Sequence, residues 1–444
     1  MTGADPQNPG GAGDGTPEVP PTPEVENPTA GTTLTEDPPA DDAERAESRW
    51  AGALRDAVSG NAATAFFSVF LAAVIGSLLI IATDSDVHDT LGYVTARPGD
   101  FFTAAWDAIS GAYSALWQGA VWNSNASDFA GRIKPLTQTL QFAAPLVLAG
   151  LGVGLAFRAG MFNIGGRGQM LLGGAAAAWV AIEWDVAALF APMGSFVAHS
   201  MHLLVALLVA VLVGGLWGAL AGLLKARTGA HEVIVTIMLN YVALQLISFA
   251  LHRQGLLQAD GSNQPKSAPT PETAQLPQIL GDRFTLHAGI LLALVAVAVV
   301  WWLLNRSALG YRFRAVGENP AAARAAGIDV GKTYILVMFL AGALVGLAGA
   351  NQSLGTVTSG VNSGLDSGIG FDAITVALLG RSNPVGILFA GLLFGAFKSG
   401  GFTMQALEGI PVDLVLVLQS LIVLFLAAPP LVRAIFRLPS KEAK

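Results

Sequence analysis

Long apolar blocks alternate with short polar segments along most of the chain. The blocks Leu203–Leu224 and Ala288–Leu304, for example, contain no charged side chain. A helix that crosses a bilayer needs about 20 mostly apolar residues, because the hydrocarbon core is roughly 30 Å thick. The pattern therefore predicts a membrane protein in which several helices cross the bilayer.

Ten stretches after residue 60 have this apolar character, although the eighth and ninth are short. They lie near Ala62–Ala82, Leu136–Phe157, Gly166–Ile182, Leu203–Leu224, Val233–Leu251, Ala288–Leu304, Tyr334–Ala350, Phe371–Leu379, Gly386–Phe397 and Leu414–Ala428. A further stretch, Phe101–Trp122, has aromatic residues at both ends and Asp107 inside it. Because Trp and Tyr favour the headgroup region, we expect an interfacial helix there. The predicted fold is all-α and integral to the membrane, with about ten transmembrane helices.

Basic residues gather in every second loop between these stretches. The segment between the sixth and seventh holds Arg306, Arg312, Arg314, Arg324 and Lys332, whereas loop 257–281 has a single Lys. Since basic loops stay on the cytoplasmic side, both termini are predicted to be cytoplasmic.

Ten spans with this orientation would form two five-helix halves of inverted topology, a common arrangement in transporters. Met161–Gly174 and Leu378–Gly391, both apolar and interrupted by Gly and Asn, stand in corresponding places.

Composition separates the start of the chain from the rest. Residues 1–44 hold ten acidic and no basic residues and are rich in Pro, Gly and Thr. Such a segment buries too little apolar surface to fold, so we expect a disordered cytoplasmic tail. The predicted transmembrane domain is 45–435, with a cytoplasmic loop at 305–333, and 436–444 form a C-terminal cytoplasmic tail.

The residue types present exclude several functions. Charged residues make up 12% of the chain, against roughly 25% in a soluble domain. The chain has no cysteine and six scattered His, which argues against thiol chemistry and metal centres. A basic face of the kind that binds nucleic acid is also missing from the sequence.

The first of three motifs runs from Arg158 to Gly173 and contains five glycines, Asn163 and Gln169. Glycine tolerates a break in a helix, and free backbone groups at membrane depth occur only beside protein or a watery cavity. A broken helix near a translocation path is one interpretation. A simple cytoplasmic turn with Gly-mediated helix packing is the other.

The second motif is the basic loop from Gly310 to Gly331. Asn319 before Pro320 predicts an N-cap followed by proline at the first helical position. Ala321–Ala326 should then form a short helix that Gly327 ends. Such a helix suits docking into a groove on a soluble partner, although an ordinary capped connector would have the same pattern. The sequence Gly331-Lys332-Thr333 is not a phosphate loop, because position 326 is Ala where that motif requires Gly.

The third motif runs from Gly368 to Gly386. Asp372 adjoins an apolar segment, which makes it either a functional residue or, on capping grounds, the cap of the following helix. Asn383-Pro384 predicts a turn between two short helices.

In order and spacing, these motifs closely resemble the permease subunits of simple-sugar and nucleoside ABC importers, in the branched-chain amino-acid permease superfamily. The resemblance extends over residues 60–435. It is most specific in Phe162–Leu171 and Arg314–Ile328, and less so in Phe371–Gly386. The family usually has Glu where Arg167 stands, so no acidic role is carried over to that position. The Asn-Ile-Gly form of the first motif is most similar to nucleoside-type members.

The resemblance implies a permease subunit that moves a nucleoside or simple sugar across the plasma (inner) membrane without being an enzyme. The implied partners are a second homologous permease, two ABC ATPase subunits and an extracytoplasmic substrate-binding protein. No cofactor, metal site or catalytic residue is expected in this chain, because ATP would be bound by the partner ATPases. The loop around Pro320 would be the coupling helix that transmits ATPase closure to the spans.

Two groups of residues are the candidates for these roles. The ATPase-coupling candidates are Glu318, Asn319, Pro320, Ala321, Ala322, Arg324, Ala326 and Gly327. The substrate-path candidates are Asn163, Gly165, Gln169, Asn240, Asn351, Gln352 and Phe371, of which the amides would equally serve in helix packing.

The main alternative is an ion-coupled secondary transporter of a small neutral solute. Such a protein would normally carry buried acids or His within its spans. Here Glu183 and Asp185 fall at a span edge and the central spans are nearly free of charge. A channel or structural subunit is a third possibility, but it would not explain the capped Ala-rich loop.

Overall fold

The computed structural model describes residues 61–437, and all of them belong to one compact unit. The predicted tail 1–44, the start of the predicted transmembrane domain (45–60) and residues 438–444 lie outside the described part. Within it the chain is helical, with two isolated bridges and no strand, which confirms the all-α prediction. The helices are α2 (Asn61–Thr83), α3 (Ser85–Leu91), α4 (Pro98–Ala120), α5 (Phe129–Arg158), α6 (Gly166–Glu183), α7 (Val186–Phe190), α8 (Ser195–Thr228), α9 (Glu232–Leu251), α10 (Gly289–Arg306), α11 (Ala308–Glu318), α12 (Pro320–Ala325), α13 (Val330–Asn351), α14 (Ile369–Leu379), α15 (Pro384–Glu408), α16 (Val412–Ala427) and α17 (Pro429–Phe436), with short turns η1 (Ala191–Met193), η2 (Glu272–Ala274) and η3 (Gln352–Thr356).

Each of the ten predicted apolar stretches contains a helix, but not all are long enough to cross a bilayer. Among residues 61–437, seven helices have the required length and hydropathy. Two bent helix pairs raise the number to nine if each pair counts as one span. In the first pair α6 meets α7 and η1 at a bend of 59°, and the second pair is α16 with α17. Helix α14 has 11 residues and is therefore about 16 Å long, roughly half the hydrocarbon thickness.

The ninth stretch is longer than the pattern predicted. Helix α15 has 25 residues and continues past Phe397 to Glu408. Lys398 interrupts the apolar pattern, but the following residues hold the helix against α4. The Ser399 hydroxyl donates to the Gly119 carbonyl oxygen at 2.7 Å, and Gly400 lies against Leu116. The turn predicted at Asn383-Pro384 is present, but it joins one short and one long helix.

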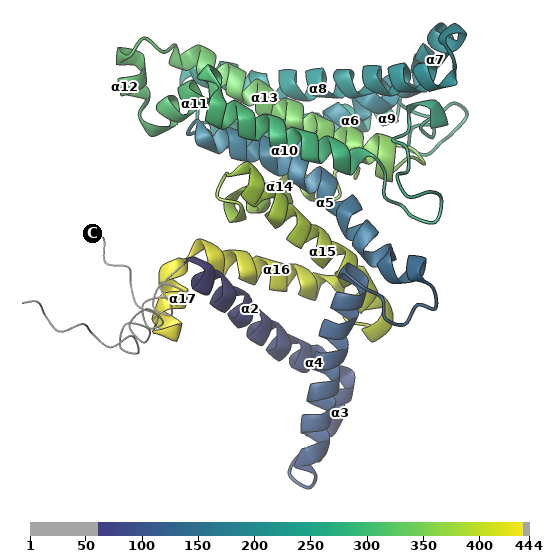
Figure 1. Ribbon diagram of the computed structural model, residues 1–444, viewed down its shortest axis with the longest axis vertical. Helices are drawn as coiled ribbons and strands as arrows, with labels where there is room; N and C mark the ends of the chain where they lie inside the picture. Colours follow the sequence, from purple (N-terminus) through teal and green to yellow (C-terminus); the bar gives the residue numbers. More distant parts are fainter. Residues whose placement is uncertain (1–60, 438–444) are drawn as a thin grey trace, which may run out of the picture. The chain divides into compact units, whose positions relative to one another are not determined.

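The main buried core is built mostly from α5, α10, α13, α14 and α15, with one residue each from α6 and α8. Helix α13 also packs along α8 and α6 (Figure 1). Glycines on α8 and α13 allow the two backbones to approach closely. A Cβ on Gly214 would lie 2.6 Å from the Gly342 carbonyl oxygen, and one on Gly346 would collide with the Ala210 carbonyl oxygen. Small residues at such crossings are typical of membrane helices, where dispersion contacts drive association.

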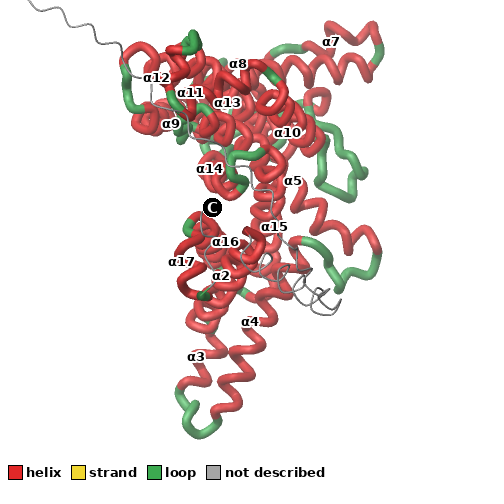
Figure 2. Tube along the Cα trace, turned by 60° about the vertical axis from the view of Figure 1, so that its left-hand side comes forward, coloured by secondary structure: helices red, strands yellow, loops and turns green. Residues whose placement is uncertain are grey.

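A second buried cluster joins α2, α4, α15 and α16. Helices α3 and α4 lie side by side as a hairpin (Figures 1 and 2). The predicted interfacial stretch Phe101–Trp122 forms α4, which contacts α15 at its C-terminal end and exposes Trp106 and Trp117.

The loops form two groups, and the loops of each group contact one another. Loops predicted to be cytoplasmic meet where Arg158 Nε donates to the Ser382 carbonyl oxygen at 3.0 Å and Gly160 approaches Gly317. Loop 252–288, which contains the segment 257–281 predicted to be outside, packs on the segment after α13, and Thr270 N donates to the Thr358 carbonyl oxygen at 2.9 Å. The grouping agrees with the alternation of charge along the chain.

Candidate functional site

Two short helices begin at the same point in the interior of the fold. Helix α6 starts at Gly166 and α14 at Ile369. A Cβ on Gly166 would lie 2.8 Å from the Gly370 carbonyl oxygen, and one on Gly370 would lie 2.5 Å from Arg167 Cα. Only glycine permits this approach. The first turns of α6 and α14 are therefore in direct contact.

This meeting point lies well inside the fold. Helix α14 runs from it for about 16 Å to the turn that carries Arg381 and Ser382, where the basic loops gather. The chain enters α14 through Ser367 and Gly368, which have φ values of +46° and +81°. A non-glycine residue in the left-handed region is strained, and such strain is common at functional sites. The fold thus holds both helix starts near mid-depth.

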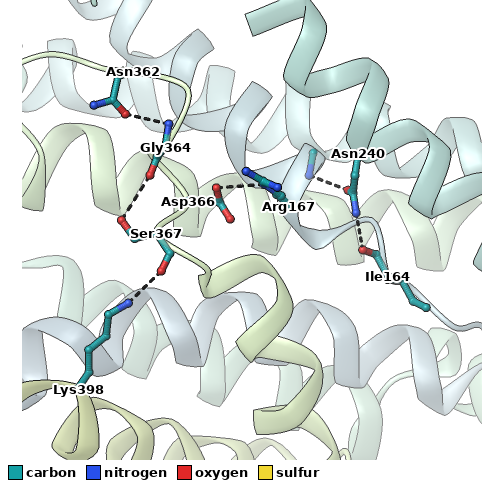
Figure 3. Close-up of polar contacts among 9 residues, drawn as sticks. Ile164, Arg167, Asn240, Asn362, Gly364, Asp366, Ser367 and Lys398 are labelled. Carbon is teal, nitrogen blue, oxygen red and sulfur yellow. Dashed lines mark hydrogen bonds and ion pairs between the residues drawn. The ribbon is translucent and has the colours of Figure 1, made fainter. Parts of the chain in front are cut away.

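An ion pair joins the two helix starts (Figure 3). Arg167 Nε lies 3.3 Å from Asp366 Oδ1, and the Asp366 side chain is only 4% exposed against 34% for Arg167. Asp366 precedes α14 by three residues, so its carboxylate also lies near the positive end of that helix. Arg167, at the position where the resemblance implied Glu, therefore pairs with an acid from the segment that leads into α14.

Four predicted path residues form one hydrogen-bonded cluster just before and within α6. Asn163 and Gln169 exchange two hydrogen bonds of 3.0 Å, and Asn163 Oδ1 also accepts from Gly165 N. Asn240 on α9 accepts from Gly168 N at 2.8 Å and donates to the Ile164 carbonyl oxygen at 2.9 Å. These amides hold the segment between α5 and α6 in an extended, buried form, as a break in the helical path requires.

The other three path candidates lie elsewhere. Asn351 and Gln352 are buried at the end of α13, where Asn351 adjoins Gly289 and His287. Phe371 lies on α14 next to Gly370 and exposes 47% of its surface. The structure therefore does not bring the seven candidates into one site, and their role in transport remains a prediction.

The polar side chains at the end of α13 leave several of their hydrogen-bonding atoms without a partner among the described residues. Both polar atoms of the Asn351 side chain and Ser353 Oγ are buried without a hydrogen-bond partner among the described residues. His287 Nδ1 accepts from Gly289 N, and its Nε2 lies 3.2 Å from Thr356 Oγ1. Burial lowers the pKa of His287 to about 4, so the ring is neutral at neutral pH.

A cavity of about 240 Å³ lies among α5, α14, α15 and α16. Its polar lining includes Asp372, which the sequence offered as a functional residue or a cap, and also Lys398 and Gln419, which the sequence analysis missed. Lys398 lies about 21 Å along α15 from Pro384 and about 15 Å from Glu408, and so in the interior of the helix. A lysine inside an apolar stretch was the available signal, but the predicted span ended at Phe397, one residue before it.

Asp372 is not the cap of α14, contrary to the capping prediction. The N-cap is Gly368, which makes no side-chain capping bond, and Asp372 is the fourth residue of the helix. The helix begins earlier because Ile369 is buried in the core, at 2% exposure, and Gly370 packs on α6. Asp372 instead lines the cavity.

Helix α12 has the form that its sequence predicted. Asn319 Oδ1 accepts from Ala321 N at 2.9 Å and from Ala322 N at 3.0 Å, Pro320 is the first residue, and Gly327 follows with φ +81°. Only Ala323 in the helix is buried, between Val316 and Val330. The remaining coupling candidates are exposed: Glu318, Asn319, Pro320, Ala321, Ala322, Arg324, Ala326 and Gly327.

A groove of about 400 Å³ lies directly beside α12. It is lined by Ala326, Gly327 and Ile328 together with Arg312 and Lys332, among others. The groove places two basic side chains next to a short, mostly exposed helix. This combination of an anchored helix and an adjacent groove can receive part of another protein.

The chain is similar to proteins of one family over most of its length. A model of the family described as "Branched-chain amino acid transport system / permease component" matches residues 136–427. No solved structure matches the chain.

Three relatives have described functions. The guanosine ABC transporter permease protein NupP of Bacillus subtilis is 38% identical over 326 residues, which cover 73% of this chain and 88% of NupP. The nucleoside ABC transporter permease protein NupB of Lactococcus lactis is 33% identical, over 67% of this chain and 80% of NupB. The glucose ABC transporter permease protein TsgB13 of Haloferax volcanii is 35% identical, over 66% of this chain and 75% of TsgB13.

Proposed function

The chain belongs to the family of branched-chain amino acid transport system permease components and is the membrane-spanning permease subunit of an ABC importer, and from this premise we propose that its substrates are nucleosides. Two relatives named for nucleoside transport, at 38% and 33% identity, support this choice. A relative named for glucose transport, at 35%, makes a simple sugar the second candidate. The nucleoside-type form of the motif Asn163-Ile164-Gly165 favours the first.

We further propose that the complex contains a second homologous permease, two ABC ATPases and an extracytoplasmic binding protein. ATP would be bound and hydrolysed by the ATPases, so this chain would need no cofactor of its own. Helix α12 supports the proposal, because its cap, its single buried residue and the adjacent groove suit a docking element. ATP-driven closure would then move the spans through this contact, as a rigid-body switch.

The proposed location is the plasma membrane, with both termini in the cytoplasm. The basic side chains around α12 support this orientation. We also propose that the fold has two inverted halves. In support, α5 and α13 are each followed by a non-helical stretch and then by α6 or α14, and these two helices start at the same point. We propose 357–379 as the element that corresponds to the segment around α6, where the sequence analysis matched Leu378–Gly391.

The ion-coupled alternative is not favoured, although for a different reason than the sequence suggested. The membrane part is not nearly free of charge, because Lys398 lies inside α15 and Asp366 pairs with Arg167. Family membership decides between the two classes instead, since the described relatives are ABC transporter permeases.

Co-purification of the ATPase tests the proposed coupling helix. Ala322→Arg with Ala326→Glu should reduce the ATPase recovered with this chain by roughly 10-fold or more, as expected when a hot-spot contact is lost. Ala188→Glu is the matched control, because Ala188 is also exposed but lies on α7, at the opposite end of α8 from α12 (Figure 1). Undiminished recovery with the double variant would show that α12 does not dock the ATPase.

A further inference from the structure

The cavity beside α14 combines an aromatic wall with a polar wall. Its volume is about 240 Å³, slightly below the roughly 300–1,000 Å³ of pockets that hold drug-sized ligands. Phe394, Phe397 and Phe402 on α15 supply three rings, and Asp372, Lys398 and Gln419 supply the polar groups. Ligand sites typically have this composition, with mostly apolar surface and a few polar groups that set orientation.

The polar groups of the cavity have unused hydrogen-bonding capacity. Gln419 is 9% exposed, and its side chain makes no hydrogen bond to other described residues. Lys398 Nζ donates one bond, to the Ser367 carbonyl oxygen at 3.0 Å, and an ammonium group has two further donors. Asp372 and Lys398 line the same cavity without forming an ion pair within 4.0 Å among the described residues. Asp372 and Lys398 are only half-buried, so these groups are accessible from the cavity and can bond to a ligand there.

The aromatic wall selects for a flat ring. Phe394 is 2% exposed and Phe397 is 9% exposed, so both rings are fixed by their surroundings, whereas Phe402 is 48% exposed and has the accessible ring face. Phe402 also packs on Phe142, with ring centroids 5.9 Å apart. Heterocyclic bases stack on aromatic side chains with their π-faces, whereas a sugar ring packs on them only with its C–H groups and needs polar partners around its hydroxyl groups. The cavity is therefore better suited to a base than to a pentose or hexose.

We propose that this cavity holds the base of the nucleoside during translocation, with its hydrogen-bonding edge toward Asp372 and Lys398. This inference rests on the proposed function and states which part of the nucleoside the cavity binds. A carboxylate accepts from ring N–H and exocyclic amino groups, and an ammonium donates to ring nitrogen or carbonyl oxygen. Guanine N1–H and its N2 amino group can both donate to one carboxylate while O6 accepts from the ammonium, whereas adenine has the N6 amino group as its single donor on that edge. The arrangement therefore predicts a preference for guanosine over adenosine.

The position of the cavity connects ligand binding to the contact between α6 and α14. Ser367 accepts from Lys398, and the preceding residue, Asp366, forms the ion pair with Arg167 (Figure 3). A base that bonds to Lys398 would act on the strained entry to α14 and so on the place where α6 and α14 meet. The seven path candidates from sequence do not include any of the polar cavity residues.

Uptake of labelled substrates by the complete transporter tests the proposal. Cells that lack their own nucleoside importers would carry the wild type, Asp372→Asn, Gln419→Leu or Phe394→Leu, and uptake of guanosine, adenosine and ribose would be measured. Asp372→Asn should lower guanosine uptake roughly 5- to 100-fold, as for a lost bidentate base contact, and reduce the preference over adenosine. Ser420→Ala is the matched control on α16, since that exposed hydroxyl bonds to its own helix and should leave uptake unchanged.

These uptake measurements distinguish the proposed substrate from the proposed base site. Wild-type uptake of ribose without nucleosides would overturn the proposed substrate, and the base site with it. Normal guanosine uptake in Asp372→Asn and Gln419→Leu, with a wild type that transports guanosine, would overturn the cavity alone. Because Phe394→Leu has a core position, the amount of assembled complex in the membrane is measured for every variant and used to normalise uptake.

Photolabelling gives a readout that does not depend on transport rate. The assembled complex would be irradiated with 8-azidoguanosine and the modified peptide identified. Label within α15 or α16 supports the proposal, and excess guanosine should suppress it. Label confined to α6 or α9, where Gln169 and Asn240 lie, would assign the base to the other cluster and overturn it.

Discussion

Arg167 and Asp366 are unequal partners, and their inequality determines what a substitution does. Asp366 is almost fully buried, whereas Arg167 retains a third of its exposure. Removing the arginine leaves a buried carboxylate without its counter-charge, which is far more costly than losing an exposed pair. The pair therefore holds the starts of α6 and α14 together through the burial of the acid.

We expect Arg167→Met to lower the free energy of unfolding by about 2–3 kcal/mol. This loss is smaller than that expected on breaking a fully buried ion pair, because Arg167 is partly exposed. Thermal unfolding of the purified protein in detergent measures the change. Arg283→Gln is the matched control, because its pair with Asp128 is exposed on both sides and should contribute at most ~1 kcal/mol. Equal losses in the two variants would contradict a structural role for the Arg167 pair.

His287 predicts a pH dependence of stability. Its pKa is lowered by burial from 6.5 to about 4, so the unfolded chain binds a proton at higher pH than the folded chain does. The free energy of unfolding should therefore fall as pH decreases from about 6.5 toward 4, by roughly 3 kcal/mol in total. Above pH 7 neither state is protonated and this contribution does not change.

Unfolding midpoints measured between pH 4 and pH 8 check this expectation. His287→Gln should flatten the acid side of the profile, whereas His88→Gln, at an exposed position on α3, should not. The prediction is wrong if the His287 variant retains the full slope below pH 6.5.

At the scale of the helices, the crossing of α8 and α13 depends on the absence of side chains. Gly214 and Gly346 lie where a Cβ would meet the backbone of the opposite helix. A backbone carbonyl cannot move aside as the end of a flexible side chain can, so any added carbon must separate the two helices. Because this crossing lies in the main core, separation would affect α5 and α6 as well.

Gly346→Ala should destabilise the protein by about 1–3 kcal/mol, the usual cost of overpacking a core. Gly99→Ala on α4 is the control, since no atom lies within 4 Å of a Cβ there and alanine favours a helix by roughly 1 kcal/mol over glycine. Opposite signs for the two variants are expected in thermal unfolding. A stabilised Gly346 variant would show that α8 and α13 are less tightly packed than the structure has them.

At the scale of the whole molecule, the loops gather in two groups, and the basic ones share a group. Membrane insertion leaves basic loops on the cytoplasmic side, so we expect the basic group to face the cytoplasm. The chain contains no cysteine, which allows a direct test with single introduced thiols.

We expect Asp260→Cys, in loop 252–288, to react with a membrane-impermeant maleimide added to intact cells. Arg324→Cys, on α12, should react only after the membrane is permeabilised. Both positions are exposed, so a difference in labelling reports the side of the membrane rather than burial. Labelling of Arg324→Cys in intact cells would reverse the orientation and remove α12 from any contact with a cytoplasmic ATPase.

Several features of this protein follow from the sequence alone, because they depend on residues that are close together in the chain. The places of the apolar helices depend on local hydropathy, although seven to nine of them, rather than ten, could span a membrane among the described residues. Helix α12 was predicted with its cap because Asn319, Pro320 and Gly327 act on the backbone within a few residues of themselves. The family, too, could be identified from three continuous motifs.

Only the tertiary structure decided which polar groups meet. Arg167 and Asp366 are 199 residues apart, and no local pattern pairs them. Asp372 has the sequence context of a cap, but α14 starts earlier because Ile369 is buried. The predicted span ended just before Lys398, but α15 continues because Ser399 and Gly400 pack on α4. The hydropathy of a segment indicates whether it leaves water, but it does not indicate which helices it contacts. Those contacts depend on where glycines allow two backbones to approach closely. The cavity lined by Asp372, Lys398 and Gln419 arises from those contacts.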